Sequence, residues 1–133
     1  MFVKLLLRRS NPEFFAALQD AEISFTQLKC LGLLSDAGEP MSLGRLSEEL
    51  GLSLPAVSRA VDGLVQRGHV KRAEDPSDRR SKLVSLSAGG RAAYERVVAV
   101  RIAAVNRFVE ELEPQERDAL GAALNPIVER LNP

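Results

Sequence analysis

This chain of 133 residues has few of the features that mark several common protein classes. It has one cysteine, Cys30, and one histidine, His69, so it can form no intramolecular disulfide and no usual structural zinc site. No apolar run approaches the roughly 18 residues of a membrane span, and the start MFVKLLLRRS lacks the order and cleavage site of a signal peptide. The sequence also shows no Gly-rich phosphate loop and no nucleophile with a plausible histidine partner. We therefore expect a soluble, cytoplasmic protein that is not an enzyme and holds no metal or cofactor.

The formal net charge is zero, but the charges are unevenly distributed. Residues 42–82 carry 8 basic and 6 acidic side chains, whereas residues 1–41 carry 4 and 5 and residues 83–133 carry 6 and 7. Hydrophobic residues make up 45% of the chain, which is enough for a core and argues against disorder. The length fits one domain, or one domain with a dimerisation appendage.

Capping signals divide the first part of the chain into helices. Residues 2–9 are apolar and basic and predict a helix, and Ser10-Asn11-Pro12-Glu13 has the spacing of a new helix start that runs to about Asp20. Ser24 or Thr26 caps the next predicted helix, which ends at Gly38 and Pro40.

Two short helices joined by a very tight turn follow. Ser42 caps LGRLSEEL, Gly51 ends this helix, and Ser53 caps the next one. This spacing is typical of a helix-turn-helix. On the second helix the apolar side chains share one face, and polar ones occupy the opposite face; the inner set is Val57, Val61 and Leu64, and the outer set is Pro55, Arg59, Asp62 and Gln66, with Ser58 beside them.

A hairpin is predicted directly after these helices, with strands near His69–Ala73 and Lys82–Leu86 and a polar loop between them. Asp78, Arg79 and Arg80 are expected at the tip of this loop. A helix that fits a major groove, beside a hairpin whose arginines reach the minor groove, is a winged helix-turn-helix, which reads double-stranded DNA.

The remaining sequence predicts a long helix capped by Ser87 and a last helix opened by Glu113-Pro114. The long helix is apolar on more than one stripe, which indicates burial by more than its own small domain. Pro126 is expected to kink or interrupt the last helix.

With these parts in order, the chain resembles the MarR family of bacterial transcriptional regulators. The segments that carry the resemblance are LSEELGLSLPAVSRAVDGLVQRGHVKR, DPSDRRSKLVSLSAGGR and LEPQERDAL. The resemblance implies a mainly α (α+β) fold in one chain of residues 1–133, with a winged helix-turn-helix at residues 24–87 and a helical dimerisation region at residues 1–23 and 88–133. It also implies a homodimer on an inverted-repeat operator, and a small anionic or aromatic effector that releases DNA. The break at Ser10-Asn11-Pro12 and Pro126 depart from the family's pattern.

The residues expected to contact DNA follow from the motifs and the resemblance together. Arg80 is expected in the minor groove, held extended by Asp78, with Arg79 nearer the phosphates. Arg59 is the main candidate for reading a guanine, although a phosphate contact or a salt bridge to Asp62 or the wing acid is about as consistent with its position. The full predicted set is Ser42, Arg45, Ser53, Pro55, Ala56, Ser58, Arg59, Asp62, Gln66, Asp78, Arg79 and Arg80.

Other residues have less distinctive interpretations. Family analogy places an effector pocket at Phe14, Phe15 and Phe25 with the start of the long helix. Cys30 lies in the mostly apolar LKCLGLL and is interpreted as a core residue and not as a redox sensor. We therefore predict a DNA-binding regulator that acts as a repressor released by an effector. The alternative is a winged-helix module for protein–protein contact, for which more apolar residues than Leu54 and Pro55 would be expected on the outer helix face.

Overall fold

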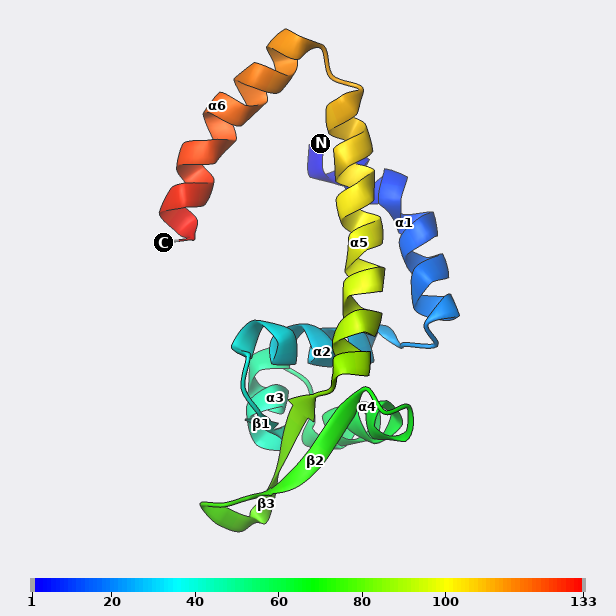
Figure 1. Ribbon diagram of the computed structural model, residues 1–133, viewed down its shortest axis with the longest axis vertical. Helices are drawn as coiled ribbons and strands as arrows, with labels where there is room; N and C mark the ends of the chain where they lie inside the picture. Colours follow the sequence, from blue (N-terminus) through cyan, green and yellow to red (C-terminus); the bar gives the residue numbers. More distant parts are fainter. Residues whose placement is uncertain (1, 133) are drawn as a thin grey trace.

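The computed structural model describes residues 2–132, which form six α-helices and a three-stranded antiparallel sheet of order β1-β3-β2 (Figure 1). The elements are α1 (Phe2–Asp20), α2 (Phe25–Ala37), β1 (Met41–Ser42), α3 (Leu43–Leu50), α4 (Leu54–Gln66), β2 (Val70–Asp75), β3 (Asp78–Leu86), α5 (Ala88–Glu110) and α6 (Pro114–Leu131). The predicted fold class, mainly α with a winged helix-turn-helix, is confirmed.

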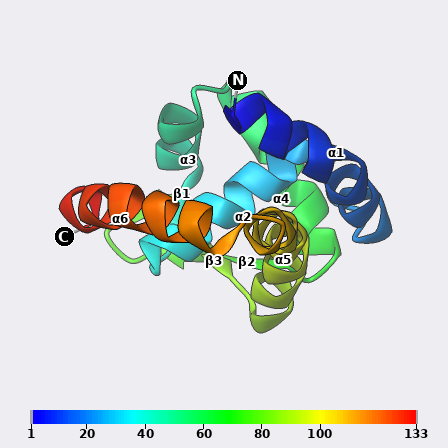
Figure 2. The same ribbon diagram turned by 90° about the horizontal axis from the view of Figure 1, so that it is seen from above.

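The elements form a winged-helix region and a helical extension. Helices α2, α3 and α4 gather around the sheet, and the β2–β3 hairpin projects from that body (Figure 1). In the extension, α1 packs along α5, while α6 turns back at the far end of α5 and stands apart from the rest of the chain (Figures 1 and 2).

The core lies mainly in the winged-helix region. Its fully buried side chains come from every helix and strand there, and they include Leu31, Leu34, Met41, Leu46, Val57, Leu64, Val70 and Val84. Full burial of a side chain of this size contributes about 1.5–3 kcal/mol. This core fixes α4 against α2, α3 and the sheet, and so determines which face of α4 points outward.

Serine caps begin four of the helices, as the sequence predicts. The hydroxyl oxygens of Ser24, Ser42, Ser53 and Ser87 accept from backbone N–H groups at 3.0–3.3 Å. Ser24, and not Thr26, caps α2, and Gln27 completes its capping box. These caps satisfy donors that would otherwise lack a partner at the helix starts.

The predicted break at Ser10-Asn11-Pro12 is wrong, because α1 runs through it and includes Pro12. Proline removes one helical hydrogen bond and bends the axis, and α1 does change direction along its length (Figure 1). Ion pairs on both sides of the proline hold the two halves to α5 and its C-cap residue: Arg9 lies 2.5 Å from Glu111, the C-cap, and Glu13 lies 2.6 Å from Arg107. These contacts and the buried Phe14 offset the lost bond.

Two further expectations need correction. α6 spans Pro114–Leu131 without a break at Pro126, so the predicted interruption is wrong; one missing backbone bond does not end a helix of 18 residues. The wing is a tighter hairpin than predicted, because β3 already begins at Asp78. The sequence analysis also missed β1, whose residues Met41 and Ser42 pair with Val84 and Leu83.

Candidate nucleic-acid interface

Helix α4 presents a polar face away from the core. Val57, Ala60, Val61 and Leu64 are buried, whereas Pro55, Arg59, Asp62 and Gln66 are exposed. Within residues 2–132 the Arg59 guanidinium has no ion-pair partner, so the predicted alternative of a salt bridge from Arg59 to Asp62 is not the arrangement in the free chain. An unpaired arginine in the second turn of such a helix is available for a ligand.

The turn between α3 and α4 sets the position of α4. Gly51 has φ of +63°, a left-handed conformation that favours glycine, and ends α3. The Ser47 hydroxyl donates to the Leu52 carbonyl at 2.6 Å, and Ser53 then caps α4 by accepting from the Ala56 N–H. The Ser53 hydroxyl keeps its own proton for a further acceptor, such as a phosphate. Ala56 and Ser58 are half-buried beside this end of α4.

Asp62 is paired within the chain. Its carboxylate lies 2.6 Å from the guanidinium of Arg72 on β2. This ion pair links the outer face of α4 to the base of the wing. Asp62 therefore helps to orient the two elements that the sequence predicts to contact DNA. Sequence reasoning missed Arg72, because nothing local in the sequence connects residues ten positions apart on a helix and a strand.

The tip of the wing is a turn at Pro76-Ser77. The Asp75 carboxylate accepts from the Ser77 N–H at 2.9 Å and from its hydroxyl at 2.7 Å, and these bonds lower the pKa of Asp75. The Asp78 carboxylate accepts from the backbone N–H of Arg80 at 3.0 Å, so it fixes the backbone of Arg80 and not its guanidinium. Asp75 and Asp78 therefore shape the start of β3 while the arginine side chains remain available.

Arg79 and Arg80 are consecutive residues of β3, so they point to opposite sides of the hairpin. Both are exposed, and neither guanidinium has an ion-pair partner in the described part of the chain. Arg80 lines a groove of about 290 Å³ between the wing and the starts of α3 and α4, together with Leu43, Gly44, Leu54, Asp78, Ser81 and Lys82. The structure thus places Arg80 on the side of the wing that faces the starts of α3 and α4.

Arg45 differs from these free arginines. Its guanidinium lies 2.9 Å from Glu39 and 2.9 Å from Glu49, and hydrogen bonds to these carboxylates raise its pKa. Ser42, beside it, caps α3 by accepting from the Arg45 N–H. A phosphate at this helix start would have to compete with two acidic residues for the Arg45 side chain.

A mostly apolar cavity of about 240 Å³ lies between α1, α2 and α5. Phe14 and Phe25, two of the three residues predicted for an effector pocket, line this cavity. Phe15 does not line it: this residue is 59% exposed, and its ring centroid lies 5.8 Å from that of Phe14. Arg101 lies 3.8 Å over the Phe14 ring, and its buried Nε has no hydrogen-bond partner in the structure described. The remaining walls are Leu28, Lys29, Gly32, Tyr94 and Val98.

The lone cysteine is a core residue, as predicted. Cys30 is 0% exposed, and burial raises the pKa of its thiol. His69 is half-buried between α4 and β2, and its pKa is lowered by burial and by the nearby Arg67 and Arg96. Along residues 2–132, none of the helices combines the length and apolar character needed to cross a membrane.

Comparison with known proteins places this architecture in a family. Residues 22–81 match the model described as MarR family. The chain is 41% identical over 69 residues to the HTH-type transcriptional regulator YcgE of Bacillus subtilis, covering 52% of this chain and 44% of YcgE. The chain thus spans less than half of this relative.

Two further likenesses extend over most of the chain. An HTH-type transcriptional regulator of Mycobacterium tuberculosis is 33% identical over 124 residues, which cover 88% of this chain and 76% of that protein. The structure of a MepR variant from S. aureus, bound to an oligodeoxyribonucleotide, superposes with a TM-score of 0.78 at 19% identity, covering 98% of this chain and 96% of that one. The winged helix-turn-helix, the family match at residues 22–81 and the long alignment agree, and the chain belongs to the MarR family of transcriptional regulators.

Proposed function

We propose that this protein is a transcriptional regulator that binds double-stranded DNA as a homodimer. The observation that carries the proposal is the set of unpaired arginines that the winged-helix region exposes: Arg59 on the outer face of α4, and Arg79 and Arg80 on opposite sides of the wing. In this arrangement α4 enters the major groove and Arg80 reaches the neighbouring minor groove, whose negative potential attracts a weakly hydrated guanidinium. The DNA-bound MepR variant, which has the same fold, supports this assignment.

The other residues predicted to contact DNA have different roles: some would contact DNA directly, and others would position a neighbouring side chain or backbone. Ser53, Ala56 and Ser58 lie at the groove-facing start of α4, and Pro55 and Gln66 extend its exposed face. Ser42 and Arg45 meet phosphates at the start of α3, after Arg45 leaves its carboxylate partners. Asp62 and Asp78 act by positioning Arg72 and the Arg80 backbone, since neither carboxylate would be favoured against phosphate. A module used only for protein contact would not need this set of unpaired cations.

The dimer follows from the helical extension. No residue of α6 is buried, and its apolar side chains Leu124, Ile127, Val128 and Leu131 are 43–69% exposed. On α5, Ile102 and Val105 are also exposed. A second copy of the chain would cover these side chains. The α4 helices of the two copies would then lie about one DNA turn apart on an inverted repeat.

The cavity that Phe14 and Phe25 line fits a small aromatic anion as effector. The Phe rings and Val98 would hold the ring, and Lys29, Arg101 and the Tyr94 hydroxyl would meet the charge. We expect benzoate to release DNA from the wild type and not from Gly32→Val, because a side chain at Gly32 would approach Tyr94 and reduce the cavity. Equal release from both proteins, measured by fluorescence anisotropy, would exclude this pocket. On this basis the regulator is a repressor released by its effector.

The sharpest test of DNA reading is Arg59→Ala. If Arg59 binds a guanine, its loss should relax preference at one base pair in each half-site by about 1–3 kcal/mol per mismatch. If it binds only phosphate, affinity should fall equally on all sequences, and the slope of log K against log salt should shrink by about one unit.

The measurement uses variants of an operator found by gel shift in the DNA upstream of the protein's own gene, at two salt concentrations. Arg91→Ala, which removes the same charge from α5, is the matched control and should change neither quantity. If Arg59→Ala changes neither the base preference nor the salt dependence of binding, α4 does not read the DNA sequence and the DNA-binding proposal fails.

A further inference from the structure

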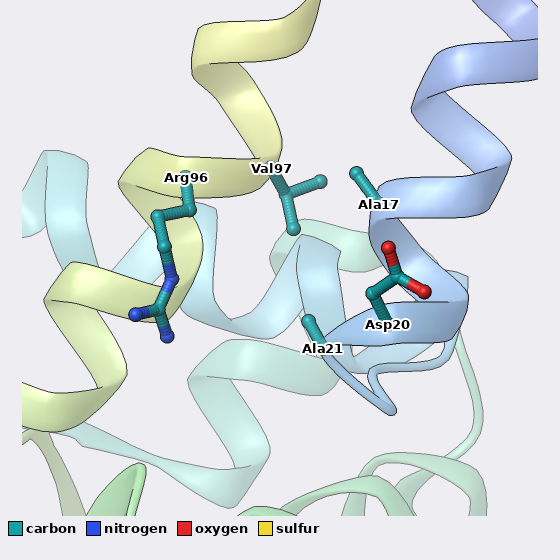
Figure 3. Close-up of a pocket in the computed structure, with 5 residues that line it drawn as sticks. All are labelled: Ala17, Asp20, Ala21, Arg96 and Val97. Atoms are coloured by element: carbon teal, nitrogen blue, oxygen red, sulfur yellow. The ribbon is translucent and has the colours of Figure 1, made fainter.

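A second cavity, separate from the one that Phe14 lines, opens between α1 and α5. It measures about 270 Å³ and is lined by Ala17 and Asp20 of α1, by Ala21 directly after α1, and by Arg96 and Val97 of α5 (Figure 3). The two cavities share no residue. The space exists because alanines stand at positions 17 and 21, where larger side chains would fill the gap between two packed helices.

The walls of this cavity carry opposite charges. In Figure 3 the Asp20 carboxylate lies on the α1 side and the Arg96 guanidinium on the α5 side, with Ala21 and Val97 between them. The two groups form no ion pair with each other, and neither has another ion-pair partner within residues 2–132. Elsewhere charges are paired between α1 and α5 through Glu13–Arg107, and between α1 and the C-cap residue of α5 through Arg9–Glu111. At this cavity, therefore, the α1–α5 interface holds one acidic and one basic side chain, Asp20 and Arg96, that are not paired with other side chains.

We propose that this cavity binds a small elongated zwitterion. Its anionic end would pair with Arg96, its cationic end with Asp20, and its apolar body would lie on Ala17, Ala21 and Val97. Both charge-assisted contacts are needed, because a molecule with only one charged end would leave the other wall unmatched. A volume of about 270 Å³ is near the lower limit of ligand pockets, which restricts the ligand to a short molecule.

The position of the cavity connects it to the winged-helix region. Burial lowers the pKa of His69, and the positive charges of Arg67 and then of Arg96 lower it further. Arg67 in turn lies 2.5 Å from Glu22, in the turn between α1 and α2. The His69 carbonyl packs so closely on Gly90 of α5 that a Cβ there would collide with it. A ligand that bridges α1 and α5 would thus tighten the junction from which α4 and the wing project.

The single histidine of the chain makes the experiment direct. NMR spectra of the full-length protein would follow the His69 ring while γ-aminobutyrate, δ-aminovalerate and ε-aminocaproate are titrated in, with caproate and hexylamine as probes that each lack one charge. We expect at least one ω-amino acid to shift His69 saturably and to raise its pKa, because an anion at Arg96 screens the positive charge that lowers that pKa. Caproate and hexylamine should bind about tenfold or more weakly, since each loses one charge-assisted contact.

Three variants locate the site. Asp20→Asn and Arg96→Gln should each weaken binding about tenfold or more for the same reason, and Arg96→Gln should raise the His69 pKa before any ligand is added. Ala17→Leu should abolish binding by filling the cavity while both charges remain. Arg91→Gln, on the same helix, is the control and should bind like the wild type.

The proposal fails if none of the three ω-amino acids shifts His69. It also fails if caproate binds as well as ε-aminocaproate, or if Ala17→Leu still binds. None of these outcomes depends on DNA, so they leave the proposed regulatory function to its own test.

Discussion

The winged-helix region and the last helix use their apolar residues in opposite ways. In the winged-helix region, leucines such as Leu31, Leu46 and Leu64 are 0% exposed, and each packs on side chains from other elements of the same chain. On α6, Leu124 and Leu131 are 44% and 69% exposed. Both regions have apolar residues at helical spacing, yet only one of them has a core. An amphipathic helix sequence therefore predicts that one face is buried, but it does not predict whether that face is covered by the same chain or by another one.

The largest effect should come from charging the uncovered helix. Leu124→Glu combined with Val128→Glu should convert the proposed dimer to monomers, because burial of such side chains contributes about 1.5–3 kcal/mol each and a symmetric dimer contains both changes twice. Light scattering at micromolar concentration measures the mass. Leu54→Glu combined with Val65→Glu alters similarly exposed residues of α4 and should leave the dimer intact. A wild-type protein that is already monomeric would refute the dimer.

A core substitution tests the other side of the comparison. Leu64→Ala should lower the free energy of unfolding by about 2–5 kcal/mol, since it opens a cavity at a fully buried position. Leu54→Ala, on the same helix but 51% exposed, should change it by about 0.5 kcal/mol or less. Denaturant unfolding gives both values; similar losses would mean that the burial of α4 differs from this structure.

Within the winged-helix region, the free and the paired arginines should differ. Arg80→Ala should weaken specific DNA binding by about 1–3 kcal/mol, and circular dichroism should be unchanged because the wing contributes little to the core. Arg45→Ala should weaken DNA binding less than Arg80→Ala does, because Arg45 must first leave Glu39 and Glu49. A larger loss for Arg45 than for Arg80 would reverse the assigned roles.

The smallest effect is expected at Cys30. Cys30→Ser should retain DNA binding, and peroxide should not release DNA from the wild type, since a buried thiol with a raised pKa forms little of the reactive thiolate. Gel shifts with and without peroxide measure this. Peroxide-driven release that disappears in Cys30→Ser would show that the helix opens in solution.

Local chemistry made much of the winged-helix region predictable. Serine caps and Gly51 set the helix boundaries through contacts within a few residues, and the period of α4 separated Val57 and Val61 from Arg59. Contacts between distant segments were not predictable in this way. Three features join parts of the chain whose contact no local sequence signal predicts: the Asp62–Arg72 pair, the short strand β1 and the second α1–α5 cavity.

Most of the helices, the wing hairpin, the outward face of α4 and the family resemblance follow from residue type and local spacing in the sequence. Tertiary packing was needed to establish that β1 exists, that Pro12 stays within one helix, that β3 begins at Asp78, and which charged side chains form ion pairs within the chain. The cause is the same in each case. A proline's lost bond, a strand's first residue and an ion pair all depend on the free energy of packing against a partner far away in the sequence, and only the folded chain specifies that partner.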